Sequence, residues 1–156
     1  MTDGQSLKGK RLLLGVTGSI AAYKAAELVR ALKKAGAEVQ VLMTRDAARF
    51  ITPLTLGTLS EREVLVEIFP ENATGSRTKH VHLGLWADLC VVAPATATTL
   101  SKLAHGVCDS MLTATALSAR CPLLVCPAMD RDMWLHPATQ RSLGRQREDG
   151  VHLLAP

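Results

Sequence analysis

Aromatic side chains are scarce in this sequence. Two Trp, one Tyr and two Phe make up 3% of its 156 residues. Proteins that bind single-stranded nucleic acid by base stacking need several aromatic platforms, so the composition disfavours that class. The apolar residues are mainly Ala, Leu and Val, which suit helices packed on a parallel sheet.

Long apolar runs are also absent. None approaches the length of about 20 residues needed to cross a bilayer. The first ten residues, MTDGQSLKGK, contain no apolar segment, so we expect no secretory signal. The length is typical of one domain, and we expect a polar tail over 1–10 followed by a single domain over 11–156.

Charge of one sign is not concentrated anywhere along the chain. The 18 basic and 14 acidic residues give a net charge of +4, without a dense basic run. This balance permits a polyanion as partner but does not indicate one, and a phosphorylated small molecule fits it equally well.

The cysteines lack the spacing of a metal site. Cys90, Cys108, Cys121 and Cys126 form no CxxC pair, and no Cys and His residues have zinc-finger spacing. Two of the four lie inside apolar runs that are typical of buried strands. We therefore expect reduced thiols, no metal ion and a cytoplasmic location.

Apolar runs alternate with segments of helical periodicity along the whole chain. Six runs are predicted to be strands: 11–16, 38–43, 64–68, 89–93, 123–126 and 151–154, with Pro94 and Pro127 ending the fourth and fifth. Helices are predicted over 20–32, 46–50, 53–59, 98–104, 109–119 and part of 130–147, with a helical turn at 80–86. This alternation predicts an α/β fold with a doubly wound parallel sheet in three layers, similar to flavodoxin or Rossmann domains.

Ligands of such sheets bind beyond the carboxyl ends of the strands. The first predicted strand is followed by Gly18 and Ser19 at a helix N-terminus, where backbone N–H groups and the helix dipole favour an anion. The segments Thr44–Arg45, Thr96–Thr99 and Ala128–Asp130 follow three further strands at the same edge. Hydroxyl groups in three of these four segments predict a nucleotide-like or phosphorylated ligand.

Common nucleotide motifs do not match. The first loop reads GxxGxxA instead of GxGxxG, and no Gly-Lys-Ser/Thr follows it, so it is not a P-loop. The second strand ends without the acidic residue that holds the ribose of NAD, although Arg45 leaves NADP open. A tight turn that binds nothing also explains the glycines. Surface positions near the sheet rim equally explain His80 and His82.

Five segments, taken together, resemble the flavin-containing cysteine decarboxylases, and within them the bacterial phosphopantothenoylcysteine decarboxylases. They are GVTGSIAAYKAAE at 15–27, HVHLGLWAD at 80–88, APATATT at 93–99, LAHGVCDSML at 103–112 and PAMDRDMW at 127–134. The resemblance implies FMN as cofactor and a homo-oligomer, either a trimer or a dodecamer built of trimers, with sites between subunits.

The resemblance also implies roles for single residues. His80 stands six residues before Trp86 and corresponds to the catalytic acid or base, whereas His82 has no implied role. Met129 and Asp130 correspond to substrate-binding positions, although the family usually has Asn where this chain has Asp130. The implied FMN contacts are Gly18, Ser19, Ile20, Thr44, Thr96, Ala97, Thr98, Thr99 and Ala128.

The implied reaction is the FMN-dependent decarboxylation of 4'-phospho-N-pantothenoylcysteine to 4'-phosphopantetheine in coenzyme A biosynthesis, which is carboxy-lyase chemistry. In such enzymes the cysteinyl thiol is oxidised to a thioaldehyde, CO₂ leaves to give an enethiol, and the enethiol is reduced. The alternatives are a flavin prenyltransferase, a peptidyl-cysteine decarboxylase or a non-catalytic FMN-binding regulatory protein. No nucleic acid or membrane is expected as partner.

Family members continue beyond the final strand into a flap with a reductive cysteine, and in many bacteria into a ligase domain. The sequence stops at Pro156, so we expect a flavoprotein core without flap or ligase domain. Such a core is expected to be impaired in reduction of the enethiol more than in release of CO₂.

Overall fold

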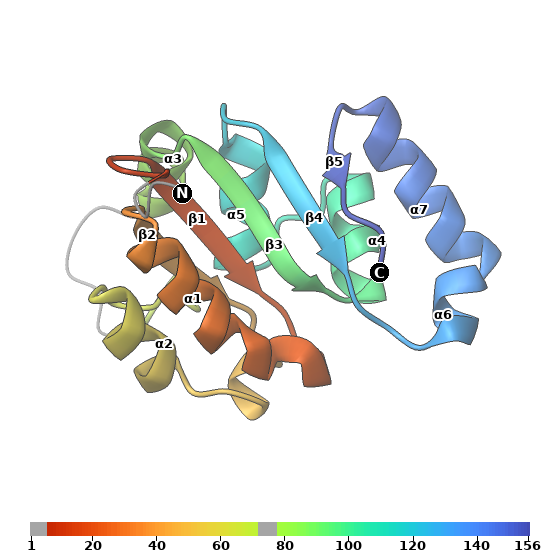
Figure 1. The fold of residues 1–156 in the computed structure, drawn as a ribbon. Helices are drawn as coiled ribbons and strands as arrows, with labels where there is room; N and C mark the ends of the chain where they lie inside the picture. Colours follow the sequence, from red (N-terminus) through yellow and green to blue (C-terminus); the bar gives the residue numbers. More distant parts are fainter. Residues whose placement is uncertain (1–5, 72–77) are drawn as a thin grey trace.

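A computed structural model of the chain describes residues 6–71 and 78–156. The described residues form one sheet of five parallel strands in the order β2-β1-β3-β4-β5 (Figure 1). The strands are β1 (Arg11–Val16), β2 (Glu38–Met43), β3 (Leu89–Ala95), β4 (Leu123–Pro127) and β5 (His152–Leu153). The chain winds outward from β1 in one direction and from β3 in the other, which confirms the doubly wound sheet.

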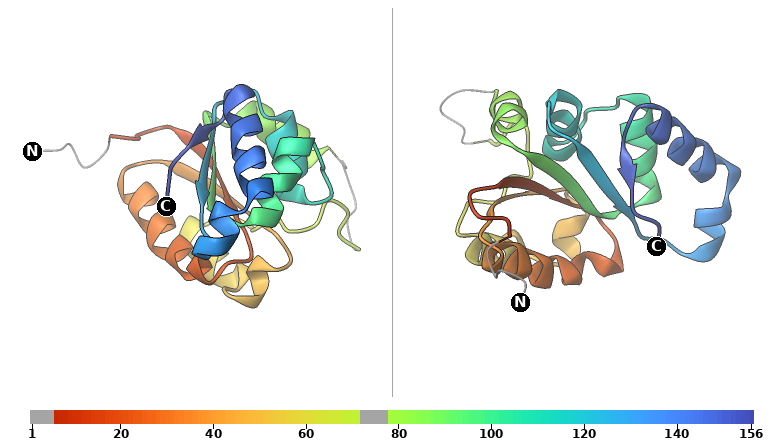
Figure 2. Two further views of the ribbon diagram at one scale, coloured as in Figure 1. Left: turned by 90° about the vertical axis from the view of Figure 1, so that its right-hand side faces the viewer. Right: turned by 45° about the horizontal axis from the view of Figure 1, so that its top comes forward.

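Helices cover both faces of the sheet, so the three-layer prediction is confirmed (Figures 1 and 2). One face carries the 3₁₀ helix η1 (Ile20–Lys24), α1 (Ala25–Lys34) and α2 (Pro53–Ser60). The other carries α3 (Lys79–Trp86), α4 (Ala97–His105) and α5 (Met111–Ser118), with α7 (Pro137–Glu148) packed against α4. The short helices η2 (Ala47–Arg49) and α6 (Arg131–Leu135) lie in connections.

The strands separate two hydrophobic cores. Successive side chains of β1 point to opposite faces, so Leu12 and Leu14 enter the cluster under α1, whereas Leu13 enters the cluster under α4 and α5. All three side chains are buried. Burial on both faces explains why the central strands β1 and β3 are almost entirely apolar instead of alternating.

The predicted strand at 64–68 is wrong. Only Leu65 forms a bridge to the edge strand β2, where its N–H donates to Val41 O over 3.2 Å and its carbonyl accepts from Met43 N over 3.0 Å. Val64 and Val66 pack against one core and Leu65 against the other. The run is therefore apolar because its side chains cover the edge of both cores. Such packing does not require a ladder of hydrogen bonds.

Three other boundaries differ from the predictions. Pro94 lies inside β3 instead of ending it, β4 extends by one residue to include Pro127 as its last residue, and the two strands shift register between Val92 and Ala95. The missing proline N–H groups are tolerated because the pairing is irregular at this point. The final predicted strand, 151–154, shortens to β5. Because 64–68 is not a strand, the described residues form a sheet of five strands instead of the six predicted.

The turn predicted at 80–86 is a complete helix, α3, which carries both His80 and His82. The polar segment 69–79 before it is predicted to be a loop, and its residues 72–77 lie outside the described residues. Within 6–71 and 78–156, no helix has the length and apolar character needed to span a membrane.

A close approach at Gly84 sets the position of α3 on α5. A Cβ atom at Gly84 would lie 2.9 Å from Ser118 O and 3.0 Å from Ser118 C, both backbone atoms. We expect Gly84→Ala to lower the free energy of unfolding by about 1–3 kcal/mol because the backbone must move.

Gly144 is the matched control, because it also lies inside a helix but has no atom within 4 Å of its ideal Cβ. Gly144→Ala should raise the free energy of unfolding by up to about 1 kcal/mol through helix propensity alone. Urea denaturation of the two variants measures both effects. Equal shifts of the same sign would contradict the assigned contact.

Candidate functional site

A groove of about 530 Å³ opens beyond the carboxyl ends of the strands. It lies at the switch point of the sheet, where β1 and β3 are neighbours and their following segments diverge. Its lining residues are Gly18, Thr44, Arg45, Asp46, Val66, Glu67, Thr96, Ala97, Thr98, Thr99, Lys102, Asp109, Ser110, Thr113 and Met133. The groove is therefore built from the segments after β1, β2 and β3 and from the start of α5.

Thr17 joins the ends of the two central strands. Its side chain is fully buried, and its hydroxyl donates to Pro94 O over 2.6 Å and accepts from Thr96 N over 3.0 Å. Because one hydroxyl makes both hydrogen bonds, the loop after β1 and the start of α4 keep a fixed separation.

Gly18 forms a crowded wall of the groove. A Cβ atom there would lie 2.5 Å from Asp46 Cβ and 3.1 Å from the Asp46 carbonyl carbon. The loop after β1 can approach the segment after β2 this closely only because residue 18 has no side chain. The approach gives a continuous backbone surface at one end of the groove.

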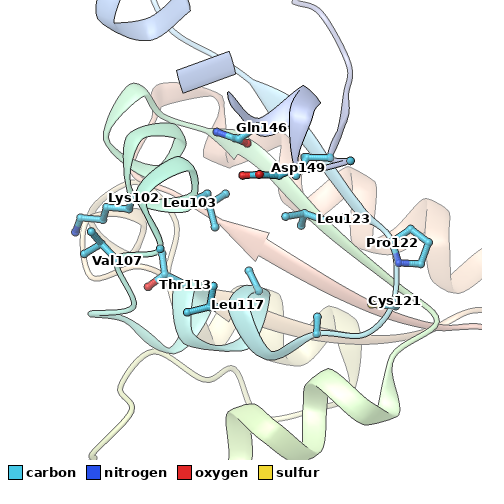
Figure 3. Close-up of a pocket in the computed structure, with 15 residues that line it drawn as sticks. Lys102, Leu103, Val107, Thr113, Leu117, Cys121, Pro122, Leu123, Gln146 and Asp149 are labelled. Carbon is cyan, nitrogen blue, oxygen red and sulfur yellow. The ribbon is translucent and has the colours of Figure 1, made fainter. Parts of the chain in front are cut away.

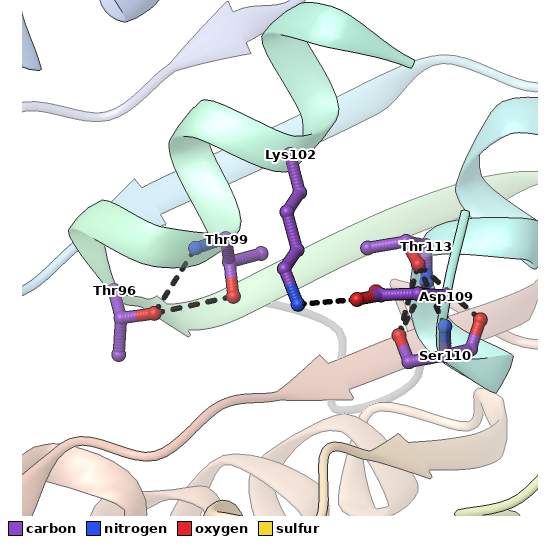
Figure 4. A network of polar contacts seen from close by, with 6 residues as sticks. All are labelled: Thr96, Thr99, Lys102, Asp109, Ser110 and Thr113. Atoms are coloured by element: carbon purple, nitrogen blue, oxygen red, sulfur yellow. Dashed lines mark hydrogen bonds and ion pairs between the residues drawn. The ribbon is translucent and has the colours of Figure 1, made fainter. Parts of the chain in front are cut away.

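Hydroxyl groups cap the helices that begin at this edge (Figure 4). Thr96 Oγ1 accepts from Thr99 N over 3.2 Å at the start of α4. At the start of α5, Ser110 Oγ accepts from Thr113 N and Thr113 Oγ1 accepts from Ser110 N, each over 3.1 Å. Helix N-termini carry free N–H groups and partial positive charge, so the two helices make this part of the groove suitable for an anion.

The cationic side chains that line the groove are already paired. Lys102 Nζ lies 2.7 Å from Asp109 Oδ2 (Figure 4), and Arg45 holds Glu67 with two hydrogen bonds of 2.6 and 2.7 Å. These hydrogen bonds lower the pKa of Asp109 and of Glu67 below their usual values. The groove thus presents backbone dipoles and hydroxyls to a ligand more than unpaired cations.

A second cavity, of about 420 Å³, lies beside the groove and contains His80. Val66 and Glu67 line both spaces, so the segment 64–68 forms the wall between them. His80 Nδ1 is buried and has no hydrogen-bond partner among residues 6–71 and 78–156. His82 is exposed on α3 and does not line this cavity.

Other sequence-predicted residues lie at the same edge but outside the groove lining. Ser19 caps η1 by accepting from Ala21 N over 3.2 Å, and the Ile20 side chain is 74% exposed. Ala128 N donates to Ala95 O, and Met129 packs against the core under α4 and α5. Asp130 is exposed and caps α6 by accepting from Met133 N over 3.0 Å.

Sequence reasoning assigned no role to Lys102, Asp109, Ser110 or Thr113. The pattern Ser110-x-x-Thr113 before an apolar run resembles a capping box and could have located the start of α5. The ion pair between Lys102 and Asp109 had no such signal, because it depends on how the connection between α4 and α5 returns to the sheet edge.

Burial suppresses the reactivity of three of the four cysteine thiols. All four are free, and burial raises the pKa of the Cys90 thiol to about 12. Burial also raises the pKa of Cys121 and of Cys126. These three thiols therefore stay protonated near neutral pH and are poor nucleophiles.

The sequence profile of the family described as Flavoprotein matches residues 1–156. The chain belongs to the flavoprotein family. The coenzyme A biosynthesis bifunctional protein CoaBC of Bacillus subtilis (strain 168) is 44% identical over 150 residues, which cover 96% of this chain and 37% of that protein. This flavoprotein thus spans about a third of the length of that curated relative.

Solved structures agree with the family assignment. The FMN-dependent cysteine decarboxylase SpaF superposes on this flavoprotein with a TM-score of 0.90 and 37% identity, over 96% of this chain and 86% of that chain. A PPC decarboxylase variant complexed with pantothenoylaminoethenethiol superposes with a TM-score of 0.81 and 32% identity, over 93% and 81%. The resemblance inferred from the five sequence segments is confirmed.

The ion pair between Arg45 and Glu67 makes a pH-dependent prediction for this flavoprotein. Because pairing lowers the pKa of Glu67, its stabilising contribution is present above the ordinary pKa of glutamate and is lost as the pH falls through the lowered value. In Arg45→Met, the pKa of Glu67 should rise toward its ordinary value. Carboxyl-carbon NMR titration measures it.

Arg49→Met is the control, because Arg49 is an exposed arginine of η2 and does not line the groove. It should leave the titration of Glu67 unchanged. An identical Glu67 titration in wild type and Arg45→Met would show that the ion pair does not form in solution.

Proposed function

We propose that this flavoprotein uses FMN to decarboxylate 4'-phospho-N-pantothenoylcysteine to 4'-phosphopantetheine, as a carboxy-lyase of coenzyme A biosynthesis. The observation that carries the proposal is the groove at the switch point, lined by glycine and hydroxyl residues and located beside the His80 cavity. The similarity to SpaF and to a PPC decarboxylase that binds pantothenoylaminoethenethiol supports the cofactor and the substrate class.

The residues of the groove fit FMN. Its volume of about 530 Å³ is in the range of small-molecule sites. The backbone surface at Gly18 and the capped start of α4 suit a phosphate group, which we expect near Ser19 or the Thr96–Thr99 hydroxyls. Thr44, Ile20 and Ala128 are proposed as further contacts. When bound, FMN supplies the two-electron oxidation and reduction of the substrate.

His80 is proposed as the acid or base that moves a proton at the substrate thiol or carboxylate. The buried Nδ1 without a partner is available for a hydrogen bond to a group that enters the second cavity. Overall, the bond between the α-carbon and the carboxylate breaks, CO₂ leaves, and a proton takes its place. His80 stands on α3, whose position depends on the contact of Gly84 with α5.

Met129 and Asp130 are proposed to contact the substrate. A carboxylate at Asp130 would repel the substrate carboxylate, so we expect it to accept from the amide N–H of the substrate instead. Asp130 Oδ1 already accepts from Met133 N at the start of α6, which leaves Oδ2 for this role.

A homo-oligomer, at least a trimer, is proposed as the working form in the cytoplasm. Ile20 and Tyr23 on η1 expose 74% and 56% of their surface at the edge where the groove opens. Contacts between subunits would shield these side chains and the flavin from water. Light scattering of the purified protein measures the mass of the assembly.

The proposed function predicts a yellow protein that releases CO₂ from 4'-phospho-N-pantothenoylcysteine. A peptide ending in cysteine is the comparison substrate, because cysteine decarboxylases that act on peptides share the chemistry. We expect faster CO₂ release from the phosphorylated substrate. Faster release from the peptide would favour a peptidyl-cysteine decarboxylase, and bound FMN without turnover of either would favour a non-catalytic FMN-binding protein.

His80→Asn should keep FMN bound but lower the rate of CO₂ release by about a hundredfold or more, the size of a general acid–base effect. His82→Asn is the matched control on the same helix and should change the rate little, because His82 is exposed and outside the cavity. Flavin absorbance measures FMN content, and labelled CO₂ measures the rate. Equal losses in the two variants would remove His80 from its proposed role.

A further inference from the structure

A third cavity, of about 390 Å³, lies between α4 and α5 over the beginning of β4 (Figure 3). The turn between α7 and β5 closes one side of it, through Asp149, Gly150 and Val151. Lys102 and Thr113 line both this cavity and the groove, but none of the other residues of the cavity lines the groove. It is therefore a separate space with no role in the function proposed above.

The middle of the cavity is apolar. Figure 3 shows Leu103 on α4, Leu117 on α5 and Leu123 on β4 around the same space. Its volume is within the range of sites for small organic molecules. A ligand of this cavity therefore needs an apolar group that can pack between the two helices.

One end of the cavity carries an unsatisfied acceptor. Gln146 is 1% exposed, and its Nε2 donates to Leu100 O over 2.8 Å. Its Oε1 is buried and has no hydrogen-bond partner within the described part of the chain. Buried polar atoms of native proteins normally have a partner, so this oxygen is available to a donor from outside the described residues.

The same end of the cavity is negative. Figure 3 shows the Asp149 carboxylate beside the Gln146 carboxamide, and Asp149 forms no ion pair with any residue of 6–71 or 78–156. The C-terminal ends of α4 and α7 also line the cavity, through Gly106 and Asp149, and helix C-termini carry partial negative charge. The cationic side chain in the wall, Lys102, is held by Asp109.

We propose that this cavity binds a small organic ammonium ion. The ammonium group lies at the end formed by Gln146 and Asp149 and donates to their oxygens, while its apolar group packs against Leu103, Leu117 and Leu123. A primary ammonium has three donors and no acceptor, which suits two acceptors and two helix C-termini. An anion of the same shape meets negative potential at this end, and a pure hydrocarbon leaves Gln146 Oε1 unpaired.

Phenethylammonium is the probe that tests the proposal, by saturation-transfer NMR on the protein as purified with its own cofactor content. Hydrocinnamate carries a similar ring and chain with the opposite charge, and phenethyl alcohol is the neutral comparison. We expect saturable binding of the ammonium, weaker binding of the alcohol and none of the carboxylate. This experiment measures neither FMN binding nor decarboxylation, so its result tests the ammonium site independently of the proposed function.

Variants locate the probe. Asp149→Asn should weaken binding by about tenfold or more, because it removes the negative charge that strengthens the hydrogen bond to the ammonium. Asp132→Asn is the matched control, because Asp132 is an exposed acid on α6 outside the cavity, and it should leave binding unchanged. Gln146→Leu should also weaken binding. Should it not fold, Leu117→Arg places a cation at a residue that is 60% exposed and should abolish binding.

Several results would overturn the proposal. Binding of hydrocinnamate as tight as that of phenethylammonium would show that charge does not select the ligand. Unchanged affinity in Asp149→Asn would place the probe elsewhere. An absence of saturable binding would show that the cavity is closed in solution, for example by a second copy of the chain, or that water alone satisfies Gln146.

Discussion

The hydroxyl of Thr17 holds together the two strands from which the sheet winds in opposite directions. It is fully buried and joins the end of β1 to Pro94 and Thr96, at the point where β3 passes into α4. If this hydroxyl were lost, the Pro94 carbonyl and the Thr96 N–H would need new partners at the switch point. The narrow loop at Gly18 and the capped start of α4 both depend on this link, and together they form the groove.

The groove offers an anion the dipoles of helix N-termini instead of unpaired cationic side chains. The cations that line it, Arg45 and Lys102, are engaged with Glu67 and Asp109. The excess of basic residues in the composition therefore does not build the site. What remains are the starts of α4 and α5, whose N–H groups are fixed in direction by the helices and need no rearrangement when a phosphate binds. This preorganisation suits a tightly held cofactor more than a diffusing polyanion.

The features that depend on the local residue pattern could be predicted from the sequence. The features that depend on neighbouring elements of the fold could not. The run 12–16 is apolar throughout, and burial on both faces of a central parallel strand explains this, so β1 and the fold class followed from it. The run 64–68 is also mostly apolar but lies beside an edge strand, where packing against two cores replaced pairing. The two runs differ in their position relative to the sheet, and residue composition does not encode that position.

The helix α4 shows how one short element can serve two sites of opposite charge. Thr96 caps its N-terminus at the groove, and Gly106, in the left-handed conformation, ends it at the cavity of Gln146 and Asp149. The helix dipole is thus positive toward the groove and negative toward the cavity, over nine residues. The preference of the first space for an anion and of the second for a cation follows from the direction of the same backbone. A substitution that reversed the charge at either end would oppose this dipole.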